Sequence, residues 1–179
     1  MTITPPVVPP VVQSVVTTAD TMVAASNAAG TYGTTNQLSS RFSTGIESFL
    51  SFALPAAPSG MQLTSASLSV RTSTDSTAAS ADTHIFRLAP GPWDEATMTW
   101  NTRLTQTSSG VIGELTGAGA TNTAYTVAIQ AADLAGLSGQ TITMRMSSTA
   151  GTDNLRIWSR EATNTSYRPT LTLTYTAVP

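Results

Sequence analysis

The sequence predicts an all-β protein, an antiparallel jelly-roll β-sandwich with an extended, proline-rich arm at its N-terminus. The first observation is that roughly eight to ten short stretches with strand-like patterns are separated by turn-forming residues at regular spacing. The second is the abundance of Thr and Ser, because Thr favours strands. The third is that only residues 130–137, QAADLAGL, have the pattern and flanking glycines of a helix. Many strands with one short helix are typical of a sandwich or barrel.

Residues 1–12 repeat the tetrad PPVV, and proline blocks helices and disfavours central strands. We therefore expect an extended arm over residues 1–14 and one sandwich domain over residues 15–179. Paired valines are costly to leave in water, so the arm is either a passive linker or a segment that docks on a partner protein. The candidate docking residues are Pro5, Pro6, Val7, Val8, Pro9, Pro10, Val11 and Val12.

The first half of the sandwich contains three predicted strands. The first covers residues 15–25, and a glycine-containing loop over residues 27–36 follows it. The second, FLSFAL, ends before Pro55. In the third, residues 61–71, Ala and Leu alternate with Ser, which indicates one buried face and one wet face.

The second half begins with a strand over residues 83–89, which Pro90-Gly91-Pro92 ends. The segment WDEATMTWN follows, and its two tryptophans are expected to pin this loop to the sandwich. Five further strands are predicted on alternation and turn signals. They cover residues 110–115, 123–129 and 141–147, and a final pair of strands lies within residues 154–175.

Composition excludes several classes of protein. Only 10% of the residues are charged and the net charge is −2, so the chain lacks the basic face that nucleic acid requires. It has no cysteine, which excludes disulfides and thiolate metal sites. It contains neither a membrane-spanning apolar run nor a signal peptide pattern. We therefore consider a cytosolic protein, a fragment of a secreted one, and a virion protein that leaves its cell by lysis.

The sequence gives little support for catalysis. The single histidine, His84, is in phase with Phe86 and Leu88 and is expected on a buried sheet face. Asp94 and Glu95 are adjacent, so in an extended segment they point to opposite sides and do not form a glycosidase pair. We predict no enzymatic activity, no cofactor and no metal site. A structural Ca²⁺ held by loop oxygens stays open as an alternative, with donors such as Asp20, Asn36, Asp75 and Asp153.

Four segments in order resemble the DNRLRE-domain family of carbohydrate-binding modules. These are ADTMV, then FLSFALP with the LTSASL strand, then WDEATMTWN, and finally IWSREATNTSYRPTLTLTY; together they span about residues 15–176. Such domains are found in polysaccharide lyases, cell-surface proteins and phage virion proteins. The resemblance implies a jelly-roll sandwich with a binding, non-catalytic role.

The candidate ligand site is a row of side chains on the strand before the last. There Arg156, Trp158 and Arg160 alternate with apolar or small residues, and Arg145 joins them if its strand pairs with theirs. A flat aromatic ring with Arg side chains suits a sugar ring with its hydroxyl or carboxylate groups. Two alternatives compete with this: Trp158 packs beneath a loop, and Arg160 forms a structural ion pair with Glu161.

These observations predict a surface-exposed, non-catalytic β-sandwich module that binds a polysaccharide or cell-surface glycan. We expect it on a virion, in the tail or as a capsid decoration, or otherwise outside a cell. One alternative is a purely structural virion component that docks on other virion proteins through its N-terminal arm. Another is a carbohydrate-binding module cut from a secreted polysaccharide-degrading enzyme.

Overall fold

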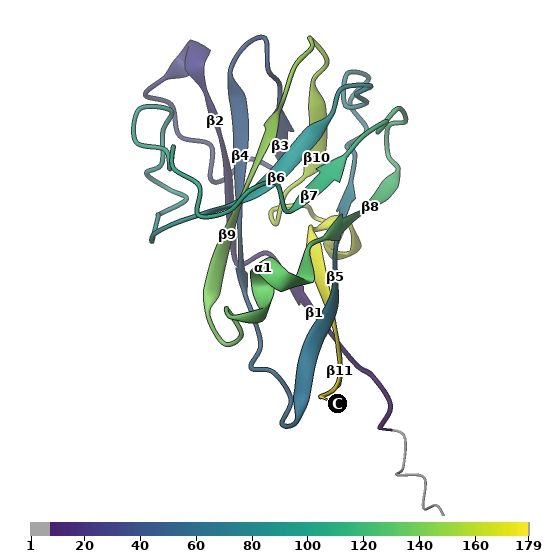
Figure 1. Ribbon diagram of the computed structural model, residues 1–179. Coiled ribbons are helices and arrows are strands. Elements are labelled where there is room, and N and C mark those ends of the chain that lie inside the picture. The colour runs from purple at the N-terminus through teal and green to yellow at the C-terminus, as the bar shows by residue number, and fades with distance from the viewer. Residues whose placement is uncertain (1–7, 179) are drawn as a thin grey trace, which may run out of the picture.

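Two antiparallel sheets pack face to face in the computed structural model, which describes residues 8–178 (Figure 1). The all-β sandwich predicted from the sequence is thereby confirmed. The four-stranded sheet has the order β1 (Val11–Val16), β11 (Thr170–Ala177), β5 (Met61–Arg71) and β8 (Ala124–Ile129). The five-stranded sheet has the order β2 (Ala19–Ala24), β4 (Ile46–Ala53), β9 (Thr141–Ser148), β6 (His84–Ala89) and β7 (Gly113–Leu115).

A third, two-stranded sheet pairs β10 (Leu155–Trp158) with β3 (Gln37–Ser40). A bridge between Thr72 and Ile157 joins β10 to the chain just beyond the end of β5, so this pair continues the four-stranded sheet at one end. The helices are short: α1 (Ala131–Ala135) and the 3-10 helices η1 (Ala25–Asn27) and η2 (Thr165–Tyr167). None of the helices among the described residues could span a membrane.

The core lies between the sheets and follows the alternation read from the sequence. Leu68 of β5 and Leu171 of β11 are register partners, and both are fully buried. Phe52 and Met144 face them from the five-stranded sheet as part of the same apolar cluster. Burial of these side chains is the main favourable term that holds the two sheets together.

The N-terminal boundary differs from the expected one. Residues 11–16 form β1, which pairs along its whole length with β11, so the strand begins inside the range 1–14 assigned to the arm. The single strand expected over residues 15–25 is two strands, because the chain crosses from one sheet to the other at Thr17 and Thr18. Among the expected docking residues, Val8, Pro9 and Pro10 are exposed and outside any strand, whereas Pro5, Pro6 and Val7 lie outside the described residues.

The loop between β6 and β7 covers the outer face of the five-stranded sheet. Its Trp93, Met98 and Trp100 pack with Val23 and Phe49 in a second apolar cluster. The Trp93 ring lies 6.3 Å from the Phe49 ring between centroids, tilted by 56°. The tryptophans therefore hold this loop against the sheet, as the sequence predicted. We call residues 90–112 the tryptophan loop.

Candidate functional site

The predicted arginine–tryptophan row is only partly assembled in the structure. Arg156 and Trp158 lie on β10 and are partly exposed, and the Arg156 guanidinium forms an ion pair with Asp75. Trp158 packs against Tyr167, with 6.0 Å between the ring centroids. The Arg71 guanidinium lies over the Tyr167 ring, 4.5 Å from its centroid. The Trp158 Nε1 atom is buried and has no hydrogen-bond partner among the described residues. Trp158 is therefore part of a stack of side chains with Tyr167 and Arg71, and it does not present an open aromatic face to a ligand.

The other two arginines of the row lie elsewhere. β9 pairs with β4 and β6, so Arg145 is not on a strand next to β10, and the condition for including it is not met. Its guanidinium donates to both carboxylate oxygens of Glu47 and to the Thr105 carbonyl oxygen. Arg160 follows the end of β10 and belongs to a separate cluster of charges.

That cluster, which we call the carboxylate cluster, consists of Asp20, Glu95, Arg160 and Glu161. Arg160 binds Glu95 through two nitrogens, with Nε 3.1 Å from Oε2, and its Nε lies 2.9 Å from Glu161 Oε1. The Arg160 backbone N–H donates to Asp20 Oδ2 at 2.8 Å, and the Asp20 N–H donates to Glu95 Oε2 at 3.1 Å. The cluster thus ties together β2, the tryptophan loop and the loop after β10.

Burial sets the protonation of the cluster. Asp20 is 1% exposed, and this burial raises the pKa of its carboxyl from 3.8 to about 7, with Glu161 and Glu95 adding to the shift and the Arg160 N–H opposing it. Asp20 Oδ1 and Glu161 Oε2 are both buried without a partner among the described residues. A proton on Asp20 relieves the repulsion with Glu161. The cluster is therefore a structural tie, and Arg160 is committed to it.

His84 lies on the inner face of β6 and is fully buried, as predicted. Its Nδ1 is 3.0 Å from Ser40 Oγ and its Nε2 is 2.9 Å from Ser80 Oγ. Burial lowers the pKa of His84 to about 4, against the opposing influence of Asp82 and Asp153. The imidazole is thus neutral near pH 7 and cannot reach a substrate.

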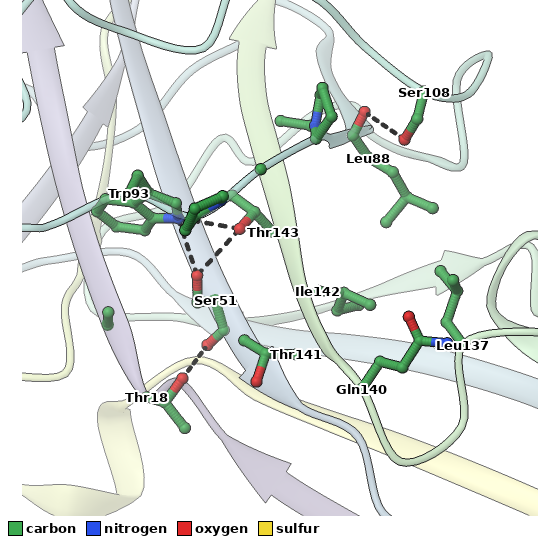
Figure 2. A pocket seen from close by; sticks show the side chains of 15 residues that line it. Thr18, Ser51, Leu88, Trp93, Ser108, Leu137, Gln140, Thr141, Ile142 and Thr143 are labelled. Carbon is green, nitrogen blue, oxygen red and sulfur yellow. Dashed lines mark hydrogen bonds between the residues drawn. The ribbon is translucent and has the colours of Figure 1, made fainter.

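A groove beside Trp93 has a volume of about 550 Å³ (Figure 2). Its floor follows from the strand register, because Ala19, Ser51, Thr143 and Ala89 occupy one row across β2, β4, β9 and β6. Small side chains along this row leave room above the sheet. The tryptophan loop forms one wall with Pro90, Gly91, Pro92 and Trp93.

Hydrogen bonds fix Trp93 at the edge of this groove. Its Nε1–H donates to Thr143 Oγ1 at 2.9 Å and to Ser51 Oγ at 3.0 Å, and these two hydroxyls are 3.1 Å apart (Figure 2). The indole is thereby held by polar groups on β4 and β9 while remaining partly exposed. A held aromatic ring loses little conformational entropy when a ligand contacts it.

The opposite side of the groove carries polar groups that the fold does not use. Gln140 and Thr141 are exposed at the start of β9 and line the cavity. Within the described structure the Thr141 hydroxyl makes no hydrogen bond, and the Gln140 side chain makes only a long one, 3.4 Å from Nε2 to the Gly136 carbonyl oxygen. None of the fifteen described residues that line the groove is charged. The site thus combines an aromatic ring, apolar surface and uncharged hydroxyl and amide groups.

Sequence reasoning missed this groove. The sequence predicts a structural role for Trp93, which the structure confirms, and it predicts Pro90-Gly91-Pro92 only as the end of a strand. The signal available was a proline–glycine–proline segment directly before a tryptophan. Its partners Ser51, Gln140 and Thr143 carried no signal, because hydroxyl and amide residues are common throughout the chain.

Comparison with known proteins gives one family. No curated protein matches the chain. The sequence model of carbohydrate-binding module family 96 matches residues 11–175, which is nearly the whole described chain. This supports the carbohydrate-binding class that the motifs implied, while the narrower DNRLRE-domain assignment stays a prediction. The chain therefore belongs to carbohydrate-binding module family 96.

Proposed function

We propose that this module binds an uncharged glycan in the groove beside Trp93 and has no catalytic activity of its own. The observation that carries the proposal is the composition of the groove, in which a fixed indole and apolar surface face unused hydroxyl and amide groups. Sugar rings offer both apolar C–H faces and hydroxyls, so this lining complements them.

The charge of the groove selects among glycans. A uronate or sulfate group in this cavity would lose its hydration without gaining an ionic partner, since the fifteen described lining residues are uncharged. The groove therefore favours neutral sugars. A non-catalytic role is consistent with the buried position of His84, whose two ring nitrogens are both occupied by serine hydroxyls.

Binding is tested with an array of neutral and acidic oligosaccharides, followed by calorimetry on the best ligand. Replacing Gln140 by Ala together with Thr141 by Val is expected to weaken binding at least about tenfold, because both polar contacts are lost. Neither side chain holds the fold together, so the melting temperature should stay near that of the wild type. Trp93→Ala should abolish binding, with some loss of stability because the loop loses its anchor.

The matched control is Trp158→Ala, which removes the aromatic ring of the predicted arginine–tryptophan row. We expect it to leave glycan binding unchanged. Binding that is lost in Trp158→Ala but retained in the Gln140 and Thr141 double variant would move the site to that row. Binding of acidic glycans alone would contradict the neutral specificity.

Location on a virion or other external surface, with docking through the N-terminal segment, stays a prediction. It is supported by the exposure of Val8, which is 50% accessible and precedes β1. Deleting residues 1–10 is expected to leave the melting temperature unchanged, because β1 begins at Val11, and to abolish attachment to a particle. Undiminished attachment of the truncated protein would reduce this segment to a spacer.

A further inference from the structure

The outer edge of the four-stranded sheet is unprotected at β1. β1 is the terminal strand of that sheet and pairs only with β11 among the described residues (Figure 1). Its sequence, VVQSVV, contains no charge and no proline, although charged residues and prolines are the usual means of keeping edge strands apart. Two of its valines, Val12 and Val16, are 61% and 50% exposed.

The hydrogen-bonding direction of each residue in β1 can be worked out from the ladder. The Thr17 N–H donates to the Pro169 carbonyl oxygen at 3.1 Å, and Val15 and Leu171 are the register partners two residues further along the ladder. In an antiparallel ladder the residues that bond to a given neighbour alternate. Odd-numbered residues therefore bond to β11, whereas Val12, Ser14 and Val16 direct their N–H and C=O groups toward the free edge.

We propose that this edge pairs with β1 of a second copy of the chain, so that two four-stranded sheets join into one of eight strands. A two-fold axis perpendicular to the sheet would pass between the two Ser14 residues. In that register Val12 lies opposite Val16 of the other copy, and Val16 lies opposite its Val12. All three outward-directed residues of each strand then exchange backbone hydrogen bonds, so no outward N–H or C=O within β1 lacks a partner.

Side chains support the same register. Val12, Ser14 and Val16 share the outer face of the sheet, since they are the register partners of the outward-facing Thr174, Thr172 and Thr170. The proposed register, Val12 with Val16 and Ser14 with Ser14, places outer-face residues of one copy opposite outer-face residues of the other. An antiparallel sheet requires this arrangement. It brings two valine–valine pairs together on that face, with no charge to desolvate. β8, at the other edge, is instead approached by β7 of the opposite sheet, where Gly113 packs against Ala128.

Six residues on each strand make a small interface, so the dimer is weak and dissociates on dilution. The dimer would carry two glycan-binding grooves, one on each copy. Because each groove lies on the outer face of the other sheet, the edge pairing does not use any residue that lines it. A multivalent glycan would then be bound more tightly by the dimer than by a single module.

The test is sedimentation velocity of the full chain over a wide concentration range, with three double variants. Val12→Lys with Val16→Lys should raise the dissociation constant at least about tenfold, because two pairs of ammonium groups face one another across the axis. Val12→Lys with Val16→Glu should restore dimerisation, since each lysine then faces a glutamate of the other copy. Ala124→Lys with Ala128→Lys, which places the same charges at the same spacing on β8, should leave the dimer unchanged.

Each other outcome contradicts the proposal. A wild type that stays monomeric at every concentration overturns it, and so does a monomer that dimerises only after residues 1–10 are deleted, because that segment would then be what covers β1. Equal dissociation in the Lys–Lys and Lys–Glu variants excludes the register. Circular dichroism and the melting temperature verify that all three variants fold, as their exposed positions predict.

Discussion

Replacing Arg160 by Met is expected to destabilise the protein by about 2–3 kcal/mol, because it leaves the carboxylate cluster without its cation. Arg160 binds Glu95 through two nitrogens and also contacts Glu161, and both carboxylates are largely buried, with side-chain exposures of 20% and 22%. Removing one partner of a buried pair costs about 3–5 kcal/mol, but the Arg160 side chain is 37% exposed, and water screens part of that loss.

Arg156→Met is the matched control for this experiment. Arg156 forms a single ion pair with Asp75, and the two side chains are 35% and 31% exposed. An exposed pair of this kind contributes little to stability, because water screens it and the two side chains lose conformational freedom. Urea denaturation of both variants at pH 7 compares the two sites directly. Equal losses of unfolding free energy would mean that the cluster is no more than an ordinary surface ion pair.

Two buried groups should give the stability of this protein opposing pH dependences. Burial raises the pKa of Asp20 from 3.8 to about 7, so between these values the folded state binds a proton that the unfolded state has lost, and stability falls as the pH rises. Burial lowers the pKa of His84 from 6.5 to about 4, so between these values the unfolded state binds the extra proton, and stability rises with pH. From pH 4 to 6.5 the two slopes oppose each other, and we expect a nearly flat wild-type profile.

Single variants should reveal each slope. Asp20→Asn, which keeps an acceptor for the Arg160 N–H, should leave the His84 effect, with stability rising by up to about 1.4 kcal/mol per pH unit from pH 4 to 6.5. His84→Gln should leave the Asp20 effect, with stability falling at a similar rate from pH 4 to 7. The free energy of unfolding is measured by urea titration at unit steps from pH 4 to 8. Slopes of the same sign in the two variants would refute the assignment.

At pH 8 Asp20→Asn should also be more stable than the wild type by up to about 4 kcal/mol, since the wild type must then bury a carboxylate beside Glu161 and Glu95. Ser69→Ala is a control for a small polar substitution away from the cluster. Ser69 lies on the exposed face of β5, and its register partner, Thr170, is uncharged. It should leave the pH profile of the wild type intact.

Alternation in the sequence predicted the sandwich because most strands have one face in the core. The Ala66, Leu68 and Val70 series is buried as expected, and so is the Leu171, Leu173 and Tyr175 series, which pairs with it. The turn between β1 and β2 was missed because Thr17 and Thr18 are ordinary strand residues, and neither glycine nor proline marks the point where the chain changes sheets. β3 was missed because QLSS is too short to show a period.

The candidate site was less accessible to sequence reasoning than the fold. The motifs that carry the family resemblance include Glu95, Arg160 and Glu161, and the structure shows that these residues join three segments of the fold. Gly33, in the loop before β3, is required by close packing, because a side chain there would collide with the Glu95 carbonyl oxygen. The groove is formed by residues from four strands and from three of the segments that connect strands or helices, so only the folded arrangement brings them together.

The order of the four-stranded sheet has a consequence for how the chain is made. β11 is an interior strand of that sheet, between β1 and β5, and it is synthesised after every other described strand. Until it leaves the ribosome, β1 and β5 have no partner between them, and Leu68 and its neighbours remain uncovered. Pairing residues 11–16 with 170–175 also closes a loop of almost the entire chain, which slows folding. The nascent protein must therefore keep a half-built apolar surface soluble until β11 has emerged, and its sparse charge provides little repulsion between molecules during that time.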